Sequence, residues 1–199
     1  MTKFLFDLDG TITRQETLPL IAEHFHVRHK IDRLTADTVA GNVPFVESFI
    51  RRVQILGTLP VSEVDALLAK VELYPLLLAF IQAHPRAACV VTGNLFCWIE
   101  SLMRRIGCPG FASQAQVEND RVAKLLSIVN KEAVVREMQA AGHYVVFVGD
   151  GNNDVAAMHL ANVAIASGLT HPPADGVLAV ADYLALDESD LCIQLNKFL

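Results

Sequence analysis

The chain has 199 residues, of which 52% are hydrophobic, and this suits one domain or one core with a modest insertion. A formal net charge of −6, with no stripe of lysine and arginine, argues against a nucleic-acid partner, and the apolar runs are far shorter than the roughly 20 residues of a membrane span. The first residues lack a signal-peptide pattern, and the four cysteines lack metal-ligand spacing, so we expect reduced thiols in a cytoplasmic protein that does not enter a membrane.

Four short apolar runs predict the strands of a parallel sheet. They cover residues 3–7, 87–92, 144–149 and 163–166. Helical patterns at 95–107, 131–142 and 152–161 lie between the last three runs. Strands that alternate with helices are typical of βαβ units. The sequence therefore predicts an α/β fold with a doubly wound parallel sheet.

The stretch between the first two strands breaks this alternation. Its pattern predicts consecutive helices at 18–27, 32–40, 44–57, 61–70 and 74–84. We therefore expect a helical cap domain over residues 15–86, inserted into a catalytic core made of residues 1–14 and 87–199. Within 112–126, two alternating pieces flank residues 119–120 and predict a small hairpin.

Two acidic residues stand where the first predicted strand ends. Asp7 closes the apolar run and Asp9 follows two places later, so both share one side of the strand while Leu8 faces the other. In an open α/β sheet, sites form beyond the C-terminal ends of the strands. Two close carboxylates repel each other unless a positive charge lies between them. A divalent cation that prefers oxygen ligands, such as Mg²⁺, would supply that charge.

Further polar groups stand at the ends of two later strands. Thr92 and Gly93 offer a hydroxyl and a free N–H that suit a phosphate oxygen. Asp150 ends a buried strand, and Asp154 opens the next helix, where an acid also has the simpler role of stabilising the helix dipole. Lys131 begins a helix at the end where the macrodipole opposes a positive charge, so another reason for its position is needed.

The segments "DLDGTIT", "VVTGN" and "GDGNND", together with Lys131, resemble the four motifs of the haloacid dehalogenase superfamily, in the right order and across the whole chain. The presence of Asp9 and Asp150 resembles its phosphatase branch. The resemblance implies that Asp7 is a nucleophile that forms an aspartyl-phosphate, and that Asp9 acts as acid and then as base. It also implies Mg²⁺ held by the side chains of Asp7 and Asp150 and by the backbone carbonyl of Asp9.

The same resemblance implies roles for the other polar groups. Thr92 and the Gly93 N–H would bind phosphate oxygens. Lys131 would neutralise charge on the phosphoryl group, and Asp154 would orient Lys131 or a metal-bound water. The amide of Asn153 would brace the site. This division suits phosphoryl transfer, which demands positioning and electrostatic stabilisation.

Two residues of the predicted cap bear on the substrate. Glu16 fits a capping box with Thr13, but Pro19 would then fall inside the helix. A helix that starts later places Pro19 in its first turn and leaves Glu16 free. Arg52 lies beside the apolar face of the helix at 44–57, where an arginine either snorkels to the surface or holds a buried anion.

Both residues resemble the phosphoserine phosphatase pattern within that superfamily, in which a glutamate lies nine residues after the nucleophile. Residues 45–60 also resemble its substrate-recognition helix, which places Phe45 and Arg52 at substrate-contact positions. There the arginine binds the carboxylate of the amino acid and Glu16 would bind its amino group. The resemblance therefore implies a Mg²⁺-dependent phosphatase of phosphoserine or a similar small phosphorylated metabolite.

The departures from that pattern concern the substrate. Asn94 stands where the family usually shows glycine, and Val39 stands where a larger apolar residue is expected. The segment 167–183 is longer than usual and lacks a Lys-Pro pair. Three alternatives therefore stay open: a phosphatase of another small phosphate ester, a phosphotransferase to an alcohol, and a non-catalytic protein of the same fold.

Overall fold

The structure, a computed structural model, describes residues 1–39 and 43–199, and the side chains at positions 30, 35–39 and 45 stand outside the description. Its described strands are β1 (Thr2–Phe6), β2 (Ala88–Leu95), β3 (Gly110–Glu118), β4 (Arg121–Ser127), β5 (Tyr144–Gly149), β6 (Val163–Ser167) and β7 (Tyr183–Ala185). Its described helices are α1 (Thr17–His24), α2 (Arg28–Val39), α3 (Phe45–Leu56), α4 (Val61–Leu68), α5 (Pro75–Ala83), α6 (Phe96–Ile106), α7 (Lys131–Ala140), α8 (Val155–Leu160), α9 (Asp175–Leu178) and α10 (Glu188–Asn196).

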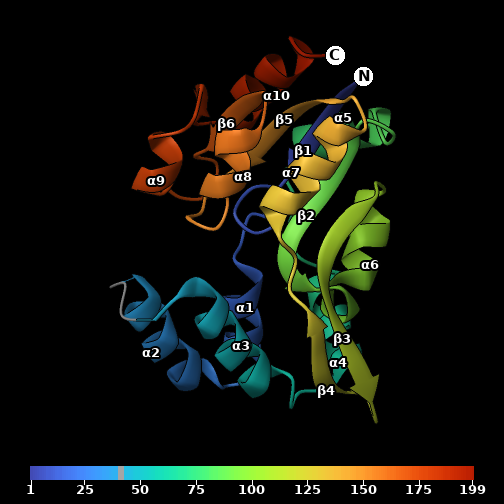
Figure 1. The fold of residues 1–199 in the computed structure, drawn as a ribbon. Coiled ribbons are helices and arrows are strands. Elements are labelled where there is room, and N and C mark those ends of the chain that lie inside the picture. Colours follow the sequence, from blue (N-terminus) through green and yellow to red (C-terminus); the bar gives the residue numbers. More distant parts are fainter. Residues whose placement is uncertain (40–42) are drawn as a thin grey trace.

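The strands form one sheet in the order β4-β3-β2-β1-β5-β6-β7, with helices on both faces (Figure 1). Strand β1 pairs in parallel with β2 on one side and with β5 on the other, and Phe4 lies opposite Ala88 and Val146. The chain extends the sheet in one direction through β2 and β3 and in the other through β5, β6 and β7. The predicted doubly wound α/β fold is confirmed, and its strand order reverses beside β1, where such folds place their sites.

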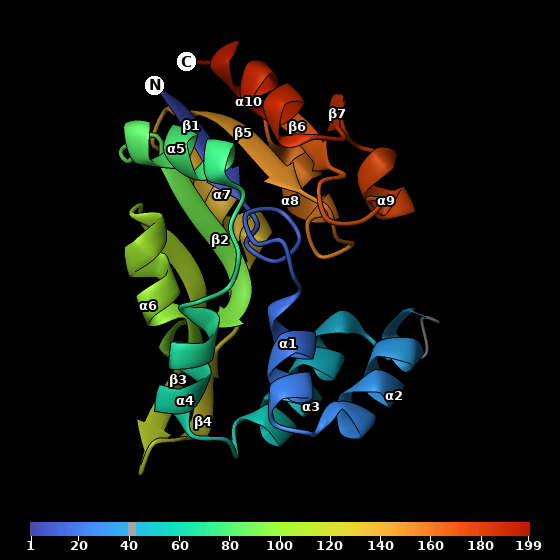
Figure 2. The ribbon, with the colours of Figure 1, turned by 180° about the vertical axis from the view of Figure 1, so that it is seen from behind.

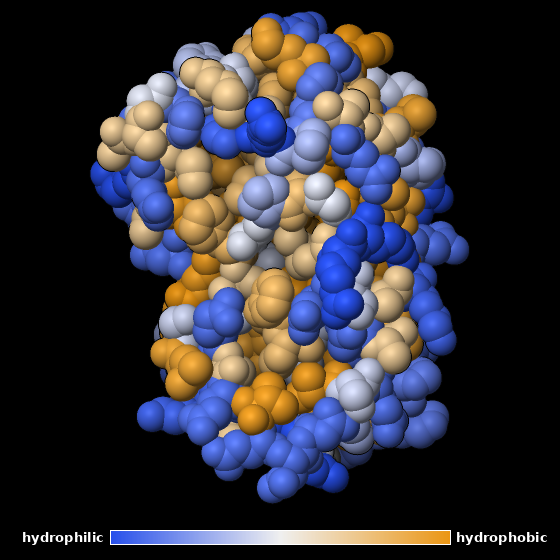
Figure 3. All heavy atoms as spheres, turned by 90° about the vertical axis from the view of Figure 1, so that its right-hand side faces the viewer, coloured by the Kyte–Doolittle hydropathy of each residue, from blue (hydrophilic) through white to orange (hydrophobic). Residues whose placement is uncertain are grey.

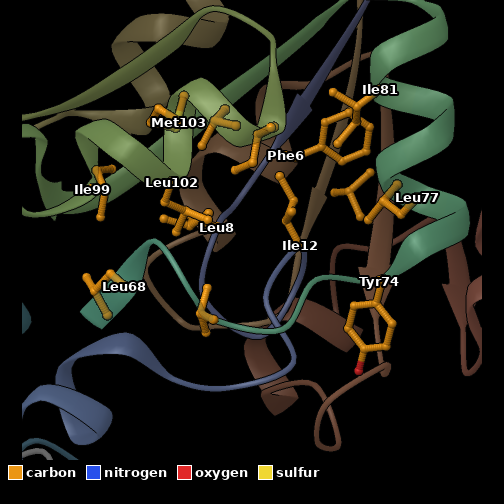
Figure 4. Packing of buried hydrophobic residues seen from close by; sticks show 14 of the residues in the cluster. Phe6, Leu8, Ile12, Leu68, Tyr74, Leu77, Ile81, Ile99, Leu102 and Met103 are labelled. Carbon is orange, nitrogen blue, oxygen red and sulfur yellow. The ribbon is translucent and has the colours of Figure 1, made fainter. Parts of the chain in front are cut away.

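Alternate residues of β1 belong to the two apolar layers that flank the sheet. Phe4 and Phe6 join a cluster that includes side chains of α5, α6 and α10 (Figure 4). Leu5 joins the second cluster with Phe147 and with side chains of α7 and α8. Full burial of each large apolar side chain contributes about 1.5–3 kcal/mol. Because helices cover both faces of the sheet, the central strands are continuous apolar runs. This pattern is what predicted them from the sequence.

The helices between β1 and β2 do not all lie in the same place. Helices α1, α2 and α3 lie beyond the C-terminal end of β1, whereas α4 packs against α6 and α5 packs against α10 (Figure 2). Phe80 of α5 packs edge-on against Phe4 of β1, with 5.2 Å between ring centroids. The all-helical character predicted for this stretch is present. The division of the chain into a cap over 15–86 and a core stays a prediction, since α5 is part of the packing on the sheet.

The predicted hairpin is the β3–β4 pair, which is antiparallel. Asn119 and Asp120 connect its strands with positive φ angles of 49° and 59°, as a tight hairpin turn requires. The turn also contacts the start of α4. The Asp120 carboxylate accepts hydrogen bonds from the Ser62 N–H at 2.9 Å and the Ser62 hydroxyl at 2.6 Å, and the Asp120 carbonyl accepts one from the Val61 N–H at 2.8 Å. The hairpin therefore caps a helix far away in the sequence.

The face that carries α6 has a mixed surface. Figure 3 shows hydrophilic residues interspersed with small groups of apolar ones on this side of the molecule. Such a distribution is ordinary for globular proteins, whose surface always includes much apolar area. No helix in the described residues is long and apolar enough to cross a membrane.

Candidate active site

Two carboxylates meet at the C-terminal ends of neighbouring parallel strands. Asp7 directly follows β1 and Asp150 directly follows β5, and they are only 5% and 4% exposed. The Leu8 N–H donates to Asp7 Oδ1 at 2.8 Å, and the Thr11 hydroxyl donates to Asp150 Oδ1 at 2.9 Å. Gly10, with φ at +72°, lets the chain turn back between these contacts. The sequence pattern thus brings both predicted carboxylates to one place.

These carboxylates open onto a cavity of about 410 Å³ between the sheet and the helices beyond β1. The cavity is lined by Asp7, Asp9, Glu16, Leu18, Pro19, Phe49, Arg52, Gly93, Asn94, Asp150, Gly151, Asn153 and His171. Predicted residues at the ends of β1, β2 and β5 and in the helical insert therefore line one small cavity. Its volume suits a small molecule.

Lys131 lies buried between two of the predicted acids. Its Nζ is 2.6 Å from Asp7 Oδ1 and 2.6 Å from Asp154 Oδ1. Burial alone would lower the pKa of Lys131, but the two carboxylates outweigh it and hold that pKa above its usual value. Asp154 also accepts hydrogen bonds from the N–H groups of Asp150 and Gly151, at 3.2 and 3.1 Å. Asp154 therefore braces the turn after β5 as well as the lysine.

The acidic cluster fits a divalent cation. Carboxylate oxygens of Asp7, Asp150 and Asp154 all lie within 4.8 Å of one another. Burial, followed by the charge of Asp154, raises the pKa of Asp7, and the charge of Lys131 offsets this only in part. A hard cation with oxygen ligands would compensate the remaining charge. Asp7 and Asp150 would hold it, because both oxygens of Asp154 already accept hydrogen bonds, Oδ1 from Lys131 and Oδ2 from the N–H groups of Asp150 and Gly151.

Asp9 lies on the same loop and is held by its neighbours. Its Oδ1 accepts a hydrogen bond from the Thr17 N–H, and its Oδ2 accepts one from Asn94 Nδ2, both at 2.8 Å. Burial raises the pKa of Asp9, while the hydrogen bonds from Thr17 work in the opposite direction. The predicted alternation is present, since Asp7 and Asp9 line the cavity while Leu8 lies in the apolar cluster.

The residues predicted to bind phosphate lie at the end of β2. Gly93 lines the cavity, and a Cβ atom added there would meet nothing within 4 Å. The Thr92 hydroxyl is buried and accepts a hydrogen bond from the Asn94 N–H at 3.1 Å. Asn153 also lines the cavity. Their roles in phosphate binding stay predictions.

Glu16 and Arg52, both assigned to the predicted cap, line the cavity. Glu16 stands just before α1, which begins at Thr17 with Pro19 in its first turn, and its side chain makes no capping hydrogen bond. Burial raises the pKa of Glu16 to about 7. Arg52 is half-buried in α3, and burial lowers its pKa while the charge of Glu16 raises it. The side chain of Phe45, predicted to contact substrate, lies outside the described residues.

Comparison with known proteins identifies the family. Residues 4–159 match the haloacid dehalogenase-like hydrolase family. The chain belongs to this family. The resemblance drawn from its four motifs is thereby confirmed.

Similar proteins of this hydrolase family include two named phosphoserine phosphatase. One, from Archaeoglobus fulgidus, is 25% identical over 81% of this chain, which spans only 51% of that relative. The other, from Lactococcus lactis subsp. lactis, is 26% identical over 81% of each chain. The solved structure of a HAD family hydrolase from Salmonella enterica has a TM-score of 0.85 at 20% identity and covers 96% of this chain and 70% of its own. At this level of identity, the structural likeness shows a shared fold alone.

One residue that lines the cavity of this haloacid dehalogenase-like hydrolase did not stand out in the sequence. His171 Nε2 lies 3.2 Å from both Glu16 Oε1 and Asp150 Oδ2. The hydrogen bond to Asp150 raises the pKa of His171 to about 10, although burial opposes it. The loop that carries it is held by Thr170, whose hydroxyl donates to the Thr13 carbonyl at 3.3 Å. The unusual length of 167–183 was the only available signal.

Proposed function

We propose that this protein is a Mg²⁺-dependent phosphomonoester hydrolase that acts on phosphoserine or a similar small phosphorylated amino acid. The observation that carries the proposal is the buried Asp7, paired with Lys131 at 2.6 Å and open to the same cavity as Asp9. Phosphoryl transfer through a carboxylate needs a nucleophile, a cation for the phosphoryl group and a second carboxylate for proton transfer.

In the proposed mechanism, a carboxylate oxygen of Asp7 attacks phosphorus and the bond from phosphorus to the ester oxygen breaks. Asp9 gives its proton to that oxygen, so an alcohol leaves and Asp7 carries the phosphoryl group. Water then attacks phosphorus while Asp9 takes a proton from that water. The bond from phosphorus to Asp7 breaks, so inorganic phosphate leaves and the Asp7 carboxylate is restored. Lys131 balances the charge of the phosphoryl group throughout. Mg²⁺ held by Asp7, Asp150 and the Asp9 carbonyl would supply further charge neutralisation.

The substrate proposal rests on Glu16 and Arg52. They line the same cavity, from the segment before α1 and from α3, and their charges suit the ammonium and carboxylate groups of an amino acid. A substrate that carries only one of these groups would lose the charged contact to the other cavity residue, which costs affinity. Two curated relatives are named phosphoserine phosphatase, which supports the same choice.

Phosphate release from four esters with Mg²⁺ tests the proposal. L-phosphoserine should be preferred over phosphothreonine, phosphoethanolamine and a sugar phosphate. Glu16→Gln should raise KM for the two amino acids and for phosphoethanolamine, whereas Arg52→Met should spare phosphoethanolamine, which has no carboxylate. We expect increases of about 10- to 100-fold, as for the loss of a charged hydrogen bond.

Asp7→Asn is the control for the chemistry and should abolish turnover of every ester. Turnover that survives this substitution would contradict Asp7 as the nucleophile. Equal turnover of all four esters by the unmodified enzyme would leave the phosphatase chemistry in place and remove phosphoserine as its preferred substrate. A rise in turnover with added alcohol would indicate transfer to that alcohol in place of hydrolysis.

A further inference from the structure

Asn94 reaches from the end of β2 to the carboxylate of Asp9. Its side chain is 3% exposed and uses both hydrogens of Nδ2, one toward Asp9 Oδ2 at 2.8 Å and one toward Thr17 Oγ1 at 2.7 Å. An ionised carboxylate can only accept hydrogen bonds, so the orientation of this amide follows from its neighbour. In this contact the Asn94 amide is therefore the donor and the Asp9 carboxylate is the acceptor.

The second oxygen of Asp9 is held by the start of α1. The Thr17 N–H donates to Asp9 Oδ1 at 2.8 Å, and Thr17 is the first residue of α1. Asn94, Asp9 and Thr17 thus form a closed set of three hydrogen bonds that joins the sheet to the cap. Each carboxylate oxygen has one donor and keeps a lone pair for a proton. This arrangement restricts rotation of the Asp9 carboxylate.

The backbone that carries Asn94 is irregular at this point. The pairing of β2 with β3 shifts register between Thr92 and Leu95, and a break in regular strand pairing can re-aim side chains, as bulges do near active sites. Two hydrogen bonds hold the irregular segment. The Asn94 N–H donates to the Thr92 hydroxyl at 3.1 Å, and the Ser113 hydroxyl donates to the Gly93 carbonyl at 2.7 Å. The amide is therefore aimed by a supported backbone and not by a flexible loop.

We propose that Asn94 is a positioning residue for Asp9, which it holds in the orientation that delivers a proton to the leaving oxygen while α1 is in place. The inference rests on the proposed function, in which Asp9 is the general acid. It adds a residue that stands where the phosphoserine phosphatase pattern usually has glycine, so the contact belongs to this chain's own site.

The nature of the leaving group separates this role from a structural one. A serine oxygen leaves poorly without a proton, whereas the nitrophenolate of 4-nitrophenyl phosphate leaves readily as an anion. Asn94→Ala should therefore lower kcat/KM for the alkyl ester that the enzyme turns over fastest by about 10- to 100-fold. The same change should lower kcat/KM for 4-nitrophenyl phosphate by less than about threefold. This parameter is the right one because it covers the steps up to departure of the alcohol.

Two further variants complete the experiment. Asp9→Asn should show the same selectivity with a larger loss, and Asn94→Ser should recover part of the lost kcat/KM with one hydroxyl donor. Thermal unfolding of each variant checks the fold.

The outcomes are distinct. The inference is supported if both Asp9→Asn and Asn94→Ala lower kcat/KM much more for the alkyl ester than for 4-nitrophenyl phosphate. Selectivity in Asp9→Asn alone, with equal losses or none in Asn94→Ala, overturns it and leaves the proposed function standing. No selectivity in Asp9→Asn removes Asp9 as the general acid, which overturns the proposed mechanism and the inference together.

Discussion

Lys131 Nζ lies 2.6 Å from Asp7 Oδ1, and both side chains are almost fully buried. A buried pair of this kind depends on each partner, because removal of one leaves an uncompensated charge in a medium of low dielectric. In this protein the dependence is increased by Asp154, which shares the lysine at the same distance. One cation therefore serves two carboxylates, and the consequences of losing it can be measured.

Lys131→Met should abolish activity and lower the free energy of unfolding by about 3–5 kcal/mol, since it leaves Asp7 and Asp154 facing each other without their cation. Urea unfolding measures the change in stability. Lys70→Met is the matched control, because Lys70 is exposed and its loss should change stability by less than about 0.5 kcal/mol. Equal stability of the two variants would contradict the account of Lys131 as a buried, shared cation.

Gly10 offers a test of how tightly the catalytic loop is packed. Its φ is +72°, and an added Cβ would lie 2.8 Å from Asp150 Oδ2 and 3.1 Å from Glu16 Oε1. Gly142 has a similar φ of +80° but meets nothing within 4 Å. Alanine at either position should therefore cost about 1–2 kcal/mol of stability through backbone strain. Only Gly10→Ala should also lose activity, by about 10²-fold, because it displaces a carboxylate of the site. Equal activity of the two variants would show that the loop can move to make room for the added Cβ without displacing the catalytic carboxylates.

The sequence predicted the parts of the fold and site that depend on local pattern. Apolar runs identified the central strands because helices cover both of their faces, and the rule that parallel strands end at one edge brought Asp7 and Asp150 together. The charge argument for Lys131 also pointed toward the site. These inferences needed only the order of residues along each strand or helix.

Other features depend on the path of the backbone between elements, which periodicity does not report. The contact from Asn94 to Asp9 requires the shifted register of β2 against β3, and the place of His171 beside Glu16 requires the course of a long loop. Val39 lies in α2, but its side chain, like that of Phe45, is outside the described residues, so the substrate contact expected of Phe45 stays a prediction.

The thiols should be unreactive in the native protein. Burial raises the pKa of Cys89 to about 12 and the pKa values of Cys97 and Cys108 to about 11, and it also raises the pKa of Cys192. Below its pKa a thiol is protonated, so at pH 8 the thiolate fraction at a pKa of 11 is about a thousandth. Titration with a disulfide reagent at pH 8 should therefore be slow for the folded protein, and all four thiols should react promptly in urea. Prompt reaction of a thiol before unfolding would contradict this expectation.

The hairpin turn should contribute to stability through the helix that it caps. Asp120 accepts two hydrogen bonds from Ser62, at the start of α4, and these bonds lower the pKa of Asp120. Asp120→Gly removes the cap and should lower Tm by roughly 2–4 °C, since an N-cap residue stabilises a helix by satisfying its free N–H groups. Asn119→Gly is the matched control. It places glycine at the adjacent position of positive φ without touching the cap, and it should leave Tm nearly unchanged.

The pH dependence of the Asp120 effect has a definite sign. Because the native-state pKa of Asp120 is lowered, its charge stabilises the folded protein above the ordinary pKa of an aspartate, and this contribution is lost as the pH falls through the lowered value. The difference in Tm between Asp120→Gly and Asn119→Gly should therefore be largest at neutral pH and shrink in acid. A difference that does not shrink in acid would contradict the carboxylate as the group that holds α4. No difference at any pH would mean that the backbone contact from the Val61 N–H to the Asp120 carbonyl suffices.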